Sequence, residues 1–307
     1  MTRIYDLVMT HKLDSDDFFI HRVQQHCAER RLNFFLIEPL WVEPFLDWFA
    51  RGQVWAKVLL NMHSEHHLPE DVYHRLVRLA AEKETKVIDP PDAALAAFDK
   101  SRLHRRLVAA KFEVPPTLLV PREQAADFRL SEEDRTLLGT PFVIKPSLGY
   151  GRRGVILDAT DERDLTRSMA GWDDPCYLLQ RRIQPHSLHG SPLYFRVYFV
   201  FDSVWCCWWN CYTDRYRMVT AAEFEELGLS RLCEVVRQVA QLTGMQFFSS
   251  EMAQTESGEL VLIDYVNDQC HLLTQSANPT MGVPDELVAA IARRLVDGAQ
   301  QLMAQAK

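Results

Sequence analysis

The sequence predicts a mixed fold: an N-terminal α/β lobe with a parallel sheet, followed by α+β lobes with antiparallel strands. In the first 90 residues, short apolar runs alternate with amphipathic helical stretches, which is typical of parallel strands joined by helices. Beyond residue 190, strand-like runs follow one another directly and are joined by short turns, as in antiparallel hairpins.

The N-terminal lobe is predicted to contain strands at Ile4–Met9, Asn33–Ile37 and Trp55–Asn61, with helices at residues 17–31 and 69–84. Ligands bind beyond the carboxyl ends of parallel strands, so the loop after the first strand supplies candidate substrate contacts: His11, Lys12, Asp14 and Asp16. A solvated loop in which Asp16 caps the helix explains these residues equally well. Three histidines follow the third strand, His63, His66 and His67, but adjacent histidines in a loop are more often unliganded than bound to a metal.

The middle of the chain holds a strand, a lysine and a glycine-rich turn. Residues 142–144 form a short apolar run, which is typical of a buried strand that holds Lys145 in a fixed position. A lysine can pair with phosphate as a compact point charge. Gly149, Gly151 and Gly154 allow positive φ angles, so successive N–H groups can fold over a polyphosphate. Taken alone, this segment is equally consistent with an ordinary hairpin, and its spacing matches neither the P-loop nor the dinucleotide fingerprint.

Acidic residues mark a second motif. The runs Phe247–Ala253 and Leu260–Tyr265 are joined by a glycine-containing turn, which predicts a hairpin in which Glu251 and Asp264 face each other. Two carboxylates and the amide oxygen of Asn267 make the all-oxygen donor set that magnesium prefers. Ordinary surface acids on a solvated hairpin are the alternative.

Together these motifs resemble the ATP-grasp family, and within it the carboxylate–amine ligases such as ribosomal-protein glutamate ligases and glutathione synthetases. The resemblance extends from Val87 to Asn267. It implies an ATP-grasp fold, in which a Rossmann-like lobe precedes a two-lobed ATP clamp. The lobes are expected at residues 1–92, at 93–179 with the glycine-rich loop, and at 180–307 with the magnesium site.

The resemblance also implies roles for individual residues. Lys145 and Arg196 are expected to be catalytic, because both would neutralise the triphosphate. The other expected ATP contacts come from a helix start, the flexible loop and an adenine-binding hinge: Lys100, Ser147, Gly149, Gly151, Gly154, Gln180, Arg181 and Ile183. Two magnesium ions are expected at Glu251, Asp264 and Asn267.

Three positions depart from the family pattern. Related ligases often have an acidic residue where this chain has Tyr194, and a basic residue on the next strand, where this chain reads Trp205–Asn210. In the metal motif of the family, one residue usually separates the acidic residue from the asparagine. Here two residues separate Asp264 from Asn267, which makes Asp268 a rival ligand.

Composition limits the classes of function. With 307 residues and 47% hydrophobic content, the chain can fill several cores. It has no run of about 20 apolar residues that would span a membrane, and its start does not resemble a signal peptide. We therefore expect a cytoplasmic protein whose seven cysteines are reduced. A net charge of −8 without a basic stripe argues against a nucleic-acid partner.

The function that the resemblance implies is an ATP- and magnesium-dependent ligase. It would join a small-molecule carboxylate to an amine through an acylphosphate and release ADP and phosphate. We expect no membrane partner, and a homodimer is possible. One alternative is a kinase of a small hydroxyl substrate, which would need a basic pocket that residues 205–210 do not supply. The other alternative is a non-catalytic nucleotide-binding regulatory protein.

Overall fold

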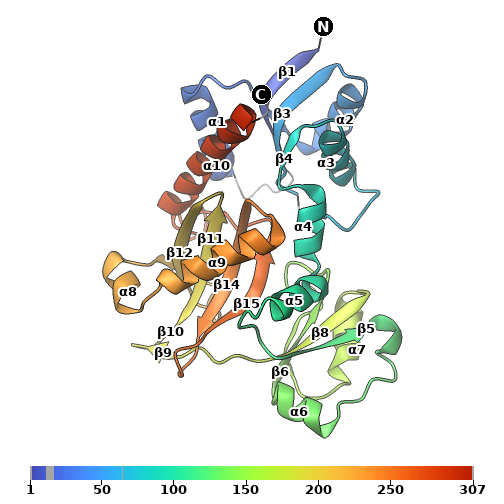
Figure 1. Cartoon of the computed structure of the whole chain (residues 1–307), viewed down its shortest axis with the longest axis vertical. Helices are drawn as coiled ribbons and strands as arrows, with labels where there is room; N and C mark the ends of the chain where they lie inside the picture. Colours follow the sequence, from blue (N-terminus) through green and yellow to red (C-terminus); the bar gives the residue numbers. More distant parts are fainter. Residues whose placement is uncertain (1, 12–16, 64, 306–307) are drawn as a thin grey trace. The chain divides into compact units, whose positions relative to one another are not determined.

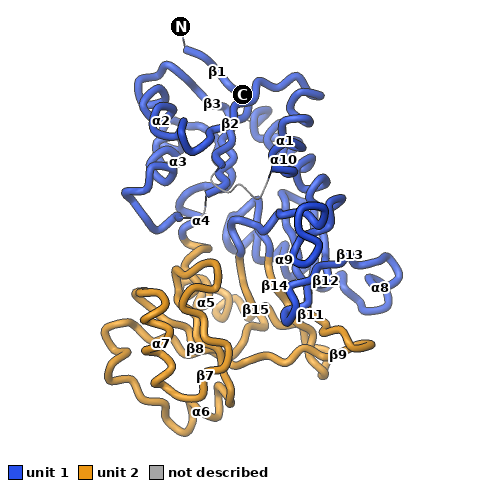
Figure 2. The backbone as a smooth tube through the Cα atoms, turned by 180° about the vertical axis from the view of Figure 1, so that it is seen from behind, with its two compact units in different colours: residues 1–95, 195–249, 267–307 blue, residues 96–194, 250–266 orange. Residues whose placement is uncertain are grey.

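The computed structural model describes residues 2–11, 17–63 and 65–305, whose elements are shown in Figure 1. The chain divides into two compact units (Figure 2). Unit 1 comprises Met1–Leu95, Phe195–Ser249 and Asn267–Lys307, and unit 2 comprises Ala96–Tyr194 and Ser250–Val266. Each unit therefore draws on segments that are far apart in the sequence, and the division into three contiguous lobes stays a prediction. The candidate contacts Lys12, Asp14 and Asp16 lie outside the described residues.

A four-stranded parallel sheet forms the N-terminal part of unit 1. Its strands are β1 (Arg3–Thr10), β2 (Phe34–Ile37), β3 (Val54–Leu60) and β4 (Lys86–Ile88), in the order β2-β1-β3-β4. The helices α1 (Asp17–Glu29), α2 (Val42–Ala50) and α3 (Val72–Glu82) alternate with them along the chain. This confirms the predicted parallel α/β fold and adds α2 and β4 to the predicted elements. Because β1 and β3 are neighbours, the loops that follow them emerge at the same edge of the sheet.

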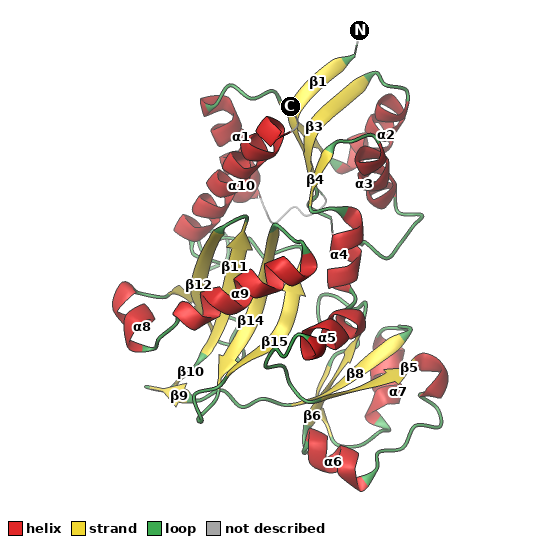
Figure 3. Cartoon of the chain, in the orientation of Figure 1, coloured by secondary structure: helices red, strands yellow, loops and turns green. Residues whose placement is uncertain are grey.

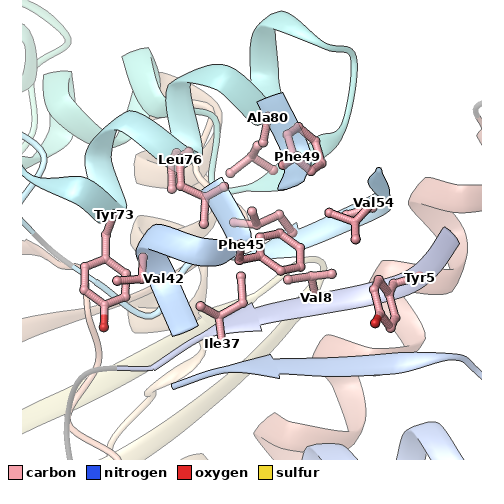
Figure 4. Close-up of a cluster of buried hydrophobic side chains, with 14 residues drawn as sticks. Tyr5, Val8, Ile37, Val42, Phe45, Phe49, Val54, Tyr73, Leu76 and Ala80 are labelled. Atoms are coloured by element: carbon pink, nitrogen blue, oxygen red, sulfur yellow. The ribbon is translucent and has the colours of Figure 1, made fainter. Parts of the chain in front are cut away.

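Aromatic side chains of α2 fill the core of this part of the molecule. Phe45 and Phe49 are fully buried, and their ring centroids are 6.1 Å apart. Figure 4 shows them beside Leu76 and Ala80 of α3 and Val8 of β1. Burial of each large apolar side chain contributes about 1.5–3 kcal/mol. The cluster therefore fixes α3, and with it the loop that joins β3 to α3.

The last helix, α10 (Asp285–Gln305), also belongs to unit 1 and packs against α1. Its buried face includes Leu287, Ile291 and Leu295, which recur at helical spacing. The Arg30 guanidinium lies 2.6 Å from Asp297 Oδ1 and joins the two helices at their partly exposed side.

Five strands form a second sheet. They are β11 (Tyr194–Val200), β12 (Ser203–Trp209), β13 (Tyr216–Met218), β14 (Phe247–Gln254) and β15 (Leu260–Asn267), in the order β13-β12-β11-β14-β15. The helices α8 (Ala221–Glu226) and α9 (Ser230–Thr243) lie between β13 and β14 in the chain (Figure 3). Gly258 has a φ of 83° in the turn between β14 and β15, where the Thr255 amide donates to Glu259 O at 2.9 Å. This turn confirms the predicted hairpin.

Unit 2 contains an antiparallel sheet of four strands. They are β5 (Thr117–Pro121), β6 (Phe142–Pro146), β7 (Ile156–Ala159) and β8 (Cys176–Arg181), in the order β5-β8-β6-β7. Its other elements are α5 (Lys100–Ala109), α6 (Glu132–Leu138), α7 (Asp164–Gly171), β9 (Ser187–Leu188) and β10 (Ser191–Pro192), while α4 (Pro91–Phe98) runs from unit 1 into unit 2. Phe142, Ile144, Tyr177 and Leu179 are among the buried side chains of the core under the sheet. Within the described ranges, no helix has the length and apolar character that a membrane span requires.

Candidate functional site

Lys100 stands at the start of α5, which is fixed to the end of β6. The Asp99 carboxylate caps the helix by accepting a hydrogen bond from the Arg102 amide at 3.0 Å. The same oxygen accepts from Ser147 Oγ at 2.6 Å and from Ser101 Oγ at 2.8 Å. Burial acts to raise the pKa of Asp99, but these hydrogen bonds outweigh it and lower the pKa. Asp99 therefore stays ionised and links α5 to β6.

The Lys100 ammonium contacts the glycine-rich loop. Its Nζ donates to Gly149 O at 2.6 Å. Burial lowers the pKa of Lys100, and the charge of Lys145 lowers it further, whereas Asp264 and then Asp174 act to raise it. Two lysines, the loop and an acidic residue of β15 therefore share one electrostatic environment within unit 2.

Lys145 lies on β6, as predicted, and pairs with Leu178 of β8. The strand buries Phe142 and Ile144, so Lys145, one residue further on, projects from the opposite face. Its Nζ donates to Ile263 O at 3.2 Å. The ammonium therefore touches the β15 backbone at the peptide that immediately precedes Asp264.

The glycine-rich loop is fixed at both of its ends. At the first end, the Asp174 carboxylate accepts hydrogen bonds from the amides of Ser147, at 3.1 Å, and Leu148, at 2.8 Å. At the other end, Gly154 has a φ of +68°, and a Cβ there would lie 2.7 Å from Trp172 Cβ and 2.9 Å from Ser168 O. Only glycine fits this position without movement of its neighbours.

The tip of the loop has open space beside Gly151. Gly151 has a φ of +59°, and a Cβ there would meet no described atom within 4 Å. The Arg153 guanidinium lies over the rings of Tyr150 and Trp172, at 5.2 and 5.5 Å from their centroids. A loop that is anchored at both ends but has room around its tip is suited to cover a ligand and to open again.

The predicted hinge begins on β8, the strand that pairs with both β5 and β6. The Gln180 side chain is buried, and its Nε2 donates to Tyr265 OH at 2.8 Å and to Thr117 Oγ1 at 3.0 Å. The Arg181 guanidinium donates to the carbonyls of Leu137, at 2.7 Å, and Thr136 at the end of α6. Both side chains are therefore used within the protein, and Ile183 lies two residues beyond the end of the strand.

Glu251 and Asp264 both belong to unit 2, on β14 and β15. Glu251 is buried, and its Oε2 accepts a hydrogen bond from Tyr194 OH at 3.1 Å. Tyr194 stands where the resemblance led us to expect an acidic side chain, and its hydroxyl contacts a predicted metal ligand. Asp264 is half-buried and acts on Lys100 as described above.

Asn267 and its rival Asp268 belong to unit 1. Asn267 Nδ2 lies 3.4 Å from Ser249 O, an arrangement that leaves Oδ1 to face a cation. Side chains three residues apart on a regular strand point to opposite faces, so Asn267 would not share the face of Asp264. Asp268 Oδ2 lies 2.9 Å from His66 Nε2, and this contact makes Asp268 the weaker candidate.

Arg196 is buried on β11 among hydroxyl groups and an indole ring. Its Nε donates to Ser249 Oγ at 3.2 Å, and its Nη1 donates to Tyr216 OH at 3.3 Å. The guanidinium carbon lies 5.5 Å from the Trp209 ring centroid. These hydroxyl groups orient the guanidinium, and an oriented guanidinium is suited to binding an anion.

The histidines proposed as candidates in the N-terminal lobe have different partners. His11 is buried at the end of β1, and its carbonyl accepts a hydrogen bond from Tyr73 OH at 3.2 Å. Of the three histidines after β3, His63 lies beside Glu65 and Asp71, whereas His66 pairs with Asp268. The three histidines do not form one shared set of ligand atoms among the described residues.

Solved structures of other proteins match nearly the whole chain. The D-alanine–D-alanine ligase from Bacillus anthracis complexed with ATP has 13% sequence identity and a TM-score of 0.66, over 100% of this chain and 98% of that one. A RimK domain protein ATP-grasp from Sphaerobacter thermophilus has 17% identity and a TM-score of 0.63, over 96% and 98%. The ATP-grasp ligase PsnB complexed with minimal precursor, magnesium and ADP has 14% identity and a TM-score of 0.61, over 97% and 98%. The chain has the ATP-grasp fold.

Sequence comparison adds no nearer relative to this ATP-grasp chain. No protein-family model matches it, and no curated protein has a similar sequence. At 12–17% identity, the solved structures establish the fold and not the substrates.

The sequence alone did not reveal several residues that support the candidate site. Asp99 links the two lysine-bearing segments, Asp174 anchors the start of the glycine-rich loop, and Tyr265 of β15 contacts Gln180 of β8. The Tyr265 hydroxyl also lies 2.7 Å from His104 Nδ1 on α5. The only available signal for Asp99 was its position before a helix, where a carboxylate is a common cap. Nothing in the sequence pattern marks Asp174 or Tyr265.

Proposed function

We propose that this protein is an ATP- and magnesium-dependent ligase that joins a carboxylate to an amine through an acylphosphate. The supporting observation is the cluster in unit 2 of two lysines, the glycine-rich loop and Asp264. Lys100 donates to the loop at Gly149, and Lys145 donates to the peptide before Asp264. The ATP-grasp fold provides the context, because the ligases that share it were solved with ATP or with ADP and magnesium.

The two lysines are proposed to bind the triphosphate. Each ammonium has three donor positions, and the hydrogen bond to a backbone carbonyl uses one of them. The remaining donors of Lys100 and Lys145 would bind phosphate oxygens, and the amides of Ser147, Gly149, Gly151 and Gly154 would cover them. Arg196 on β11 is proposed to neutralise the charge that develops when phosphate is transferred.

The hinge is proposed to bind adenine through its backbone. The side chains of Gln180 and Arg181 are engaged with Tyr265 and with the end of α6, respectively. The Arg181 amide donates to Pro116 O at 2.9 Å within the sheet, so backbone groups of residues 182 and 183, beyond the end of β8, are proposed to contact the base. This leaves the specificity for adenine to main-chain geometry and not to side-chain charge.

Magnesium fits the acidic residues by donor chemistry. Glu251 and Asp264 offer carboxylate oxygens and Asn267 an amide oxygen, which are hard donors. Bound magnesium would supply Lewis-acid charge neutralisation for the β- and γ-phosphates. We propose Glu251 and Asp264 as the principal ligands and Asn267 as an additional one, which would need the end of β15 to depart from regular strand geometry.

The proposed reaction has two steps. An oxygen of the substrate carboxylate attacks the γ-phosphorus, the bond to the β–γ bridging oxygen breaks, and ADP leaves. The amine then attacks the acyl carbon, the carbon–oxygen bond to phosphate breaks, and the amine proton passes to phosphate or water. The lysines and Arg196 stabilise the transferring charge, and the covering loop excludes water that would hydrolyse the acylphosphate. No protein nucleophile is required.

Hydroxylamine trapping tests this proposal. The purified protein would be incubated with ATP, magnesium and hydroxylamine, together with a pool of carboxylic acids and peptides that carry free carboxylates. Hydroxamates would be detected by mass spectrometry. We expect a carboxylate-dependent hydroxamate with the natural protein and with Lys111→Met, an exposed lysine of the same unit, but none with Lys145→Met. Formation of ADP and a phosphorylated alcohol when a hydroxyl compound is added, with no hydroxamate, would refute the ligase and support the kinase.

A further inference from the structure

A compact group of ligand atoms lies in unit 1, outside the proposed ATP site. It is formed by His63, just after β3, together with Glu65 and Asp71, just before α3 (Figure 1). His63 Nε2 lies 3.0 Å from Glu65 Oε2 and 3.0 Å from Asp71 Oδ1. One ligand atom from each of the three residues lies within 4.8 Å of the other two.

These side chains are shielded from water. The exposed fractions are 5% for the His63 side chain, 16% for Glu65 and 17% for Asp71. Two carboxylates brought together away from solvent repel each other and lose hydration, so a cation bound between them would be stabilised. A dication bound to neutral His63 would balance both carboxylate charges. The N-terminus of α3 offsets only part of the charge of Asp71.

The distances also fit a metal ion. An imidazolium N–H points in one direction, but His63 Nε2 is equally far from the two carboxylate oxygens. Around a tetrahedral zinc ion with bonds of about 2.0–2.1 Å, neighbouring ligand atoms are about 3.3 Å apart. The separation of 3.0 Å between His63 Nε2 and Glu65 Oε2 is close to this value and requires only a small expansion to admit the ion.

The ligands are held in place by the surrounding structure. Asn61 Nδ2 donates to His63 O at 2.9 Å, and Asn61 Oδ1 accepts from Thr10 Oγ1 at 3.1 Å, which ties the loop to β1. The His63 ring packs against Tyr73 with a centroid distance of 4.5 Å. Such second-layer contacts orient metal ligands and reduce the entropy lost on binding.

Asp71 has a structural role that is compatible with metal binding. Its Oδ1 accepts hydrogen bonds from the amides of Tyr73, at 2.9 Å, and His74, at 3.1 Å, and so caps α3. An ionised carboxylate has about four acceptor positions over its two oxygens. Capping therefore fixes the carboxylate through Oδ1 and leaves Oδ2 as the oxygen that would bind a cation.

We propose that His63, Glu65 and Asp71 form a binding site for a divalent transition-metal ion of the zinc class. One imidazole nitrogen and two carboxylate oxygens form a donor set suited to such ions, because imidazole favours zinc over magnesium. The three protein ligands leave at least one coordination position for water or an external anionic ligand. The site lies at the carboxyl end of a parallel sheet, where ligands commonly bind.

Cobalt titration tests the site, because cobalt replaces zinc and gives visible ligand-field absorption. The full-length protein, freed of metal with a chelator, would be titrated with Co²⁺ in excess magnesium, which saturates the proposed Glu251 and Asp264 site. We expect one tight equivalent of Co²⁺, displaced by Zn²⁺, with no thiolate charge-transfer band. No binding, or a thiolate band that assigns the metal to cysteines, would overturn the proposal.

Three variants make the test specific. His63→Gln and Glu65→Gln should weaken Co²⁺ binding at least tenfold. His26→Gln is the matched control, because His26 Nδ1 lies 2.9 Å from Glu29 Oε2 in an ion pair with a single carboxylate on α1, and it should bind as the natural protein does. Glu65→Gln is nearly isosteric and half-buried, so it carries the test if His63→Gln fails to fold. Unchanged Co²⁺ affinity in Glu65→Gln would overturn the proposal.

Discussion

Replacing Gly154 by alanine should release one end of the glycine-rich loop. Gly154 has a φ of +68°, and the added methyl group would lie 2.7 Å from Trp172 Cβ and 2.9 Å from Ser168 O. Neither neighbour is the far end of a flexible side chain, so the backbone around the anchor has to move. The expected effect is therefore a local loss of stability in β6, β7 and the loop between them.

Two contributions set the size of the effect. A left-handed backbone costs an L-residue about 1–2 kcal/mol, and an extra methyl group in a packed site costs about 1–3 kcal/mol. We expect Gly154→Ala to destabilise this region by about 2–5 kcal/mol in total. Gly151→Ala is the matched control, because its φ is +59° but its methyl group would meet no described atom within 4 Å. Only the backbone contribution of about 1–2 kcal/mol applies to it.

Hydrogen exchange measured by mass spectrometry on peptides from residues 142–159 reports this local stability directly. The difference of about 1–3 kcal/mol between the variants corresponds to exchange that is about 5- to 150-fold faster in Gly154→Ala than in Gly151→Ala. Equal exchange in the two variants would refute the close packing of Gly154 against Trp172, and with it the anchored loop.

Cys233 of α9 should react with iodoacetamide as an acidic thiol, because a hydrogen bond from Cys206 lowers the pKa of Cys233 to about 7. Its alkylation rate should be half-maximal near pH 7, and Cys206→Ala should move that midpoint to higher pH. An unchanged midpoint would contradict the thiol pair. Arg181→Ala should lower stability by about 0.5–1.5 kcal/mol through the lost contacts with α6 and leave ATP affinity within about twofold in calorimetry; a large loss of affinity would show that the side chain binds the nucleotide. Arg196→Lys should reduce the rate of hydroxamate formation by about 10²–10³-fold, as for loss of an oriented charge-stabilising donor. Arg217→Lys is the control, because the Arg217 guanidinium pairs with Glu223 at 2.7 Å, and its rate should stay near that of the natural protein. Equal rates in the two variants would remove Arg196 from the site.

The sequence predicted the parts of the fold that have strong local patterns. The alternation of apolar strands and helices in the first 90 residues gave the parallel sheet, and the turn at Gly258 gave the hairpin of β14 and β15. It missed β4, which has only three residues, Lys86–Ile88, and is too short to show a period. It also missed α2, where Pro44 lies in the first turn; this is a position that a helix tolerates but that resembles a break in the sequence.

The sequence predicted the charged residues of the candidate site but not the residues that hold them in place. The strand position of Lys145 follows from the apolar run before it, whereas the helix at Lys100 was expected from the resemblance to ATP-grasp proteins. The Asp174 carboxylate that anchors the loop is 26 residues away from Leu148 in the sequence, and such a long-range hydrogen bond leaves no local pattern. The same limit explains the compact units, whose segments come together only through tertiary packing.

The most direct test of the ATP-binding claim is isothermal titration calorimetry of ATP with magnesium. Loss of a charged hydrogen bond is worth about 1.5–3 kcal/mol, so Lys145→Met and Lys100→Met should each weaken binding by about 10- to 150-fold. Lys111→Met should bind ATP as the natural protein does, and omission of magnesium should weaken binding in all three. Tight, magnesium-dependent binding that is unchanged in both Lys100→Met and Lys145→Met would contradict the account.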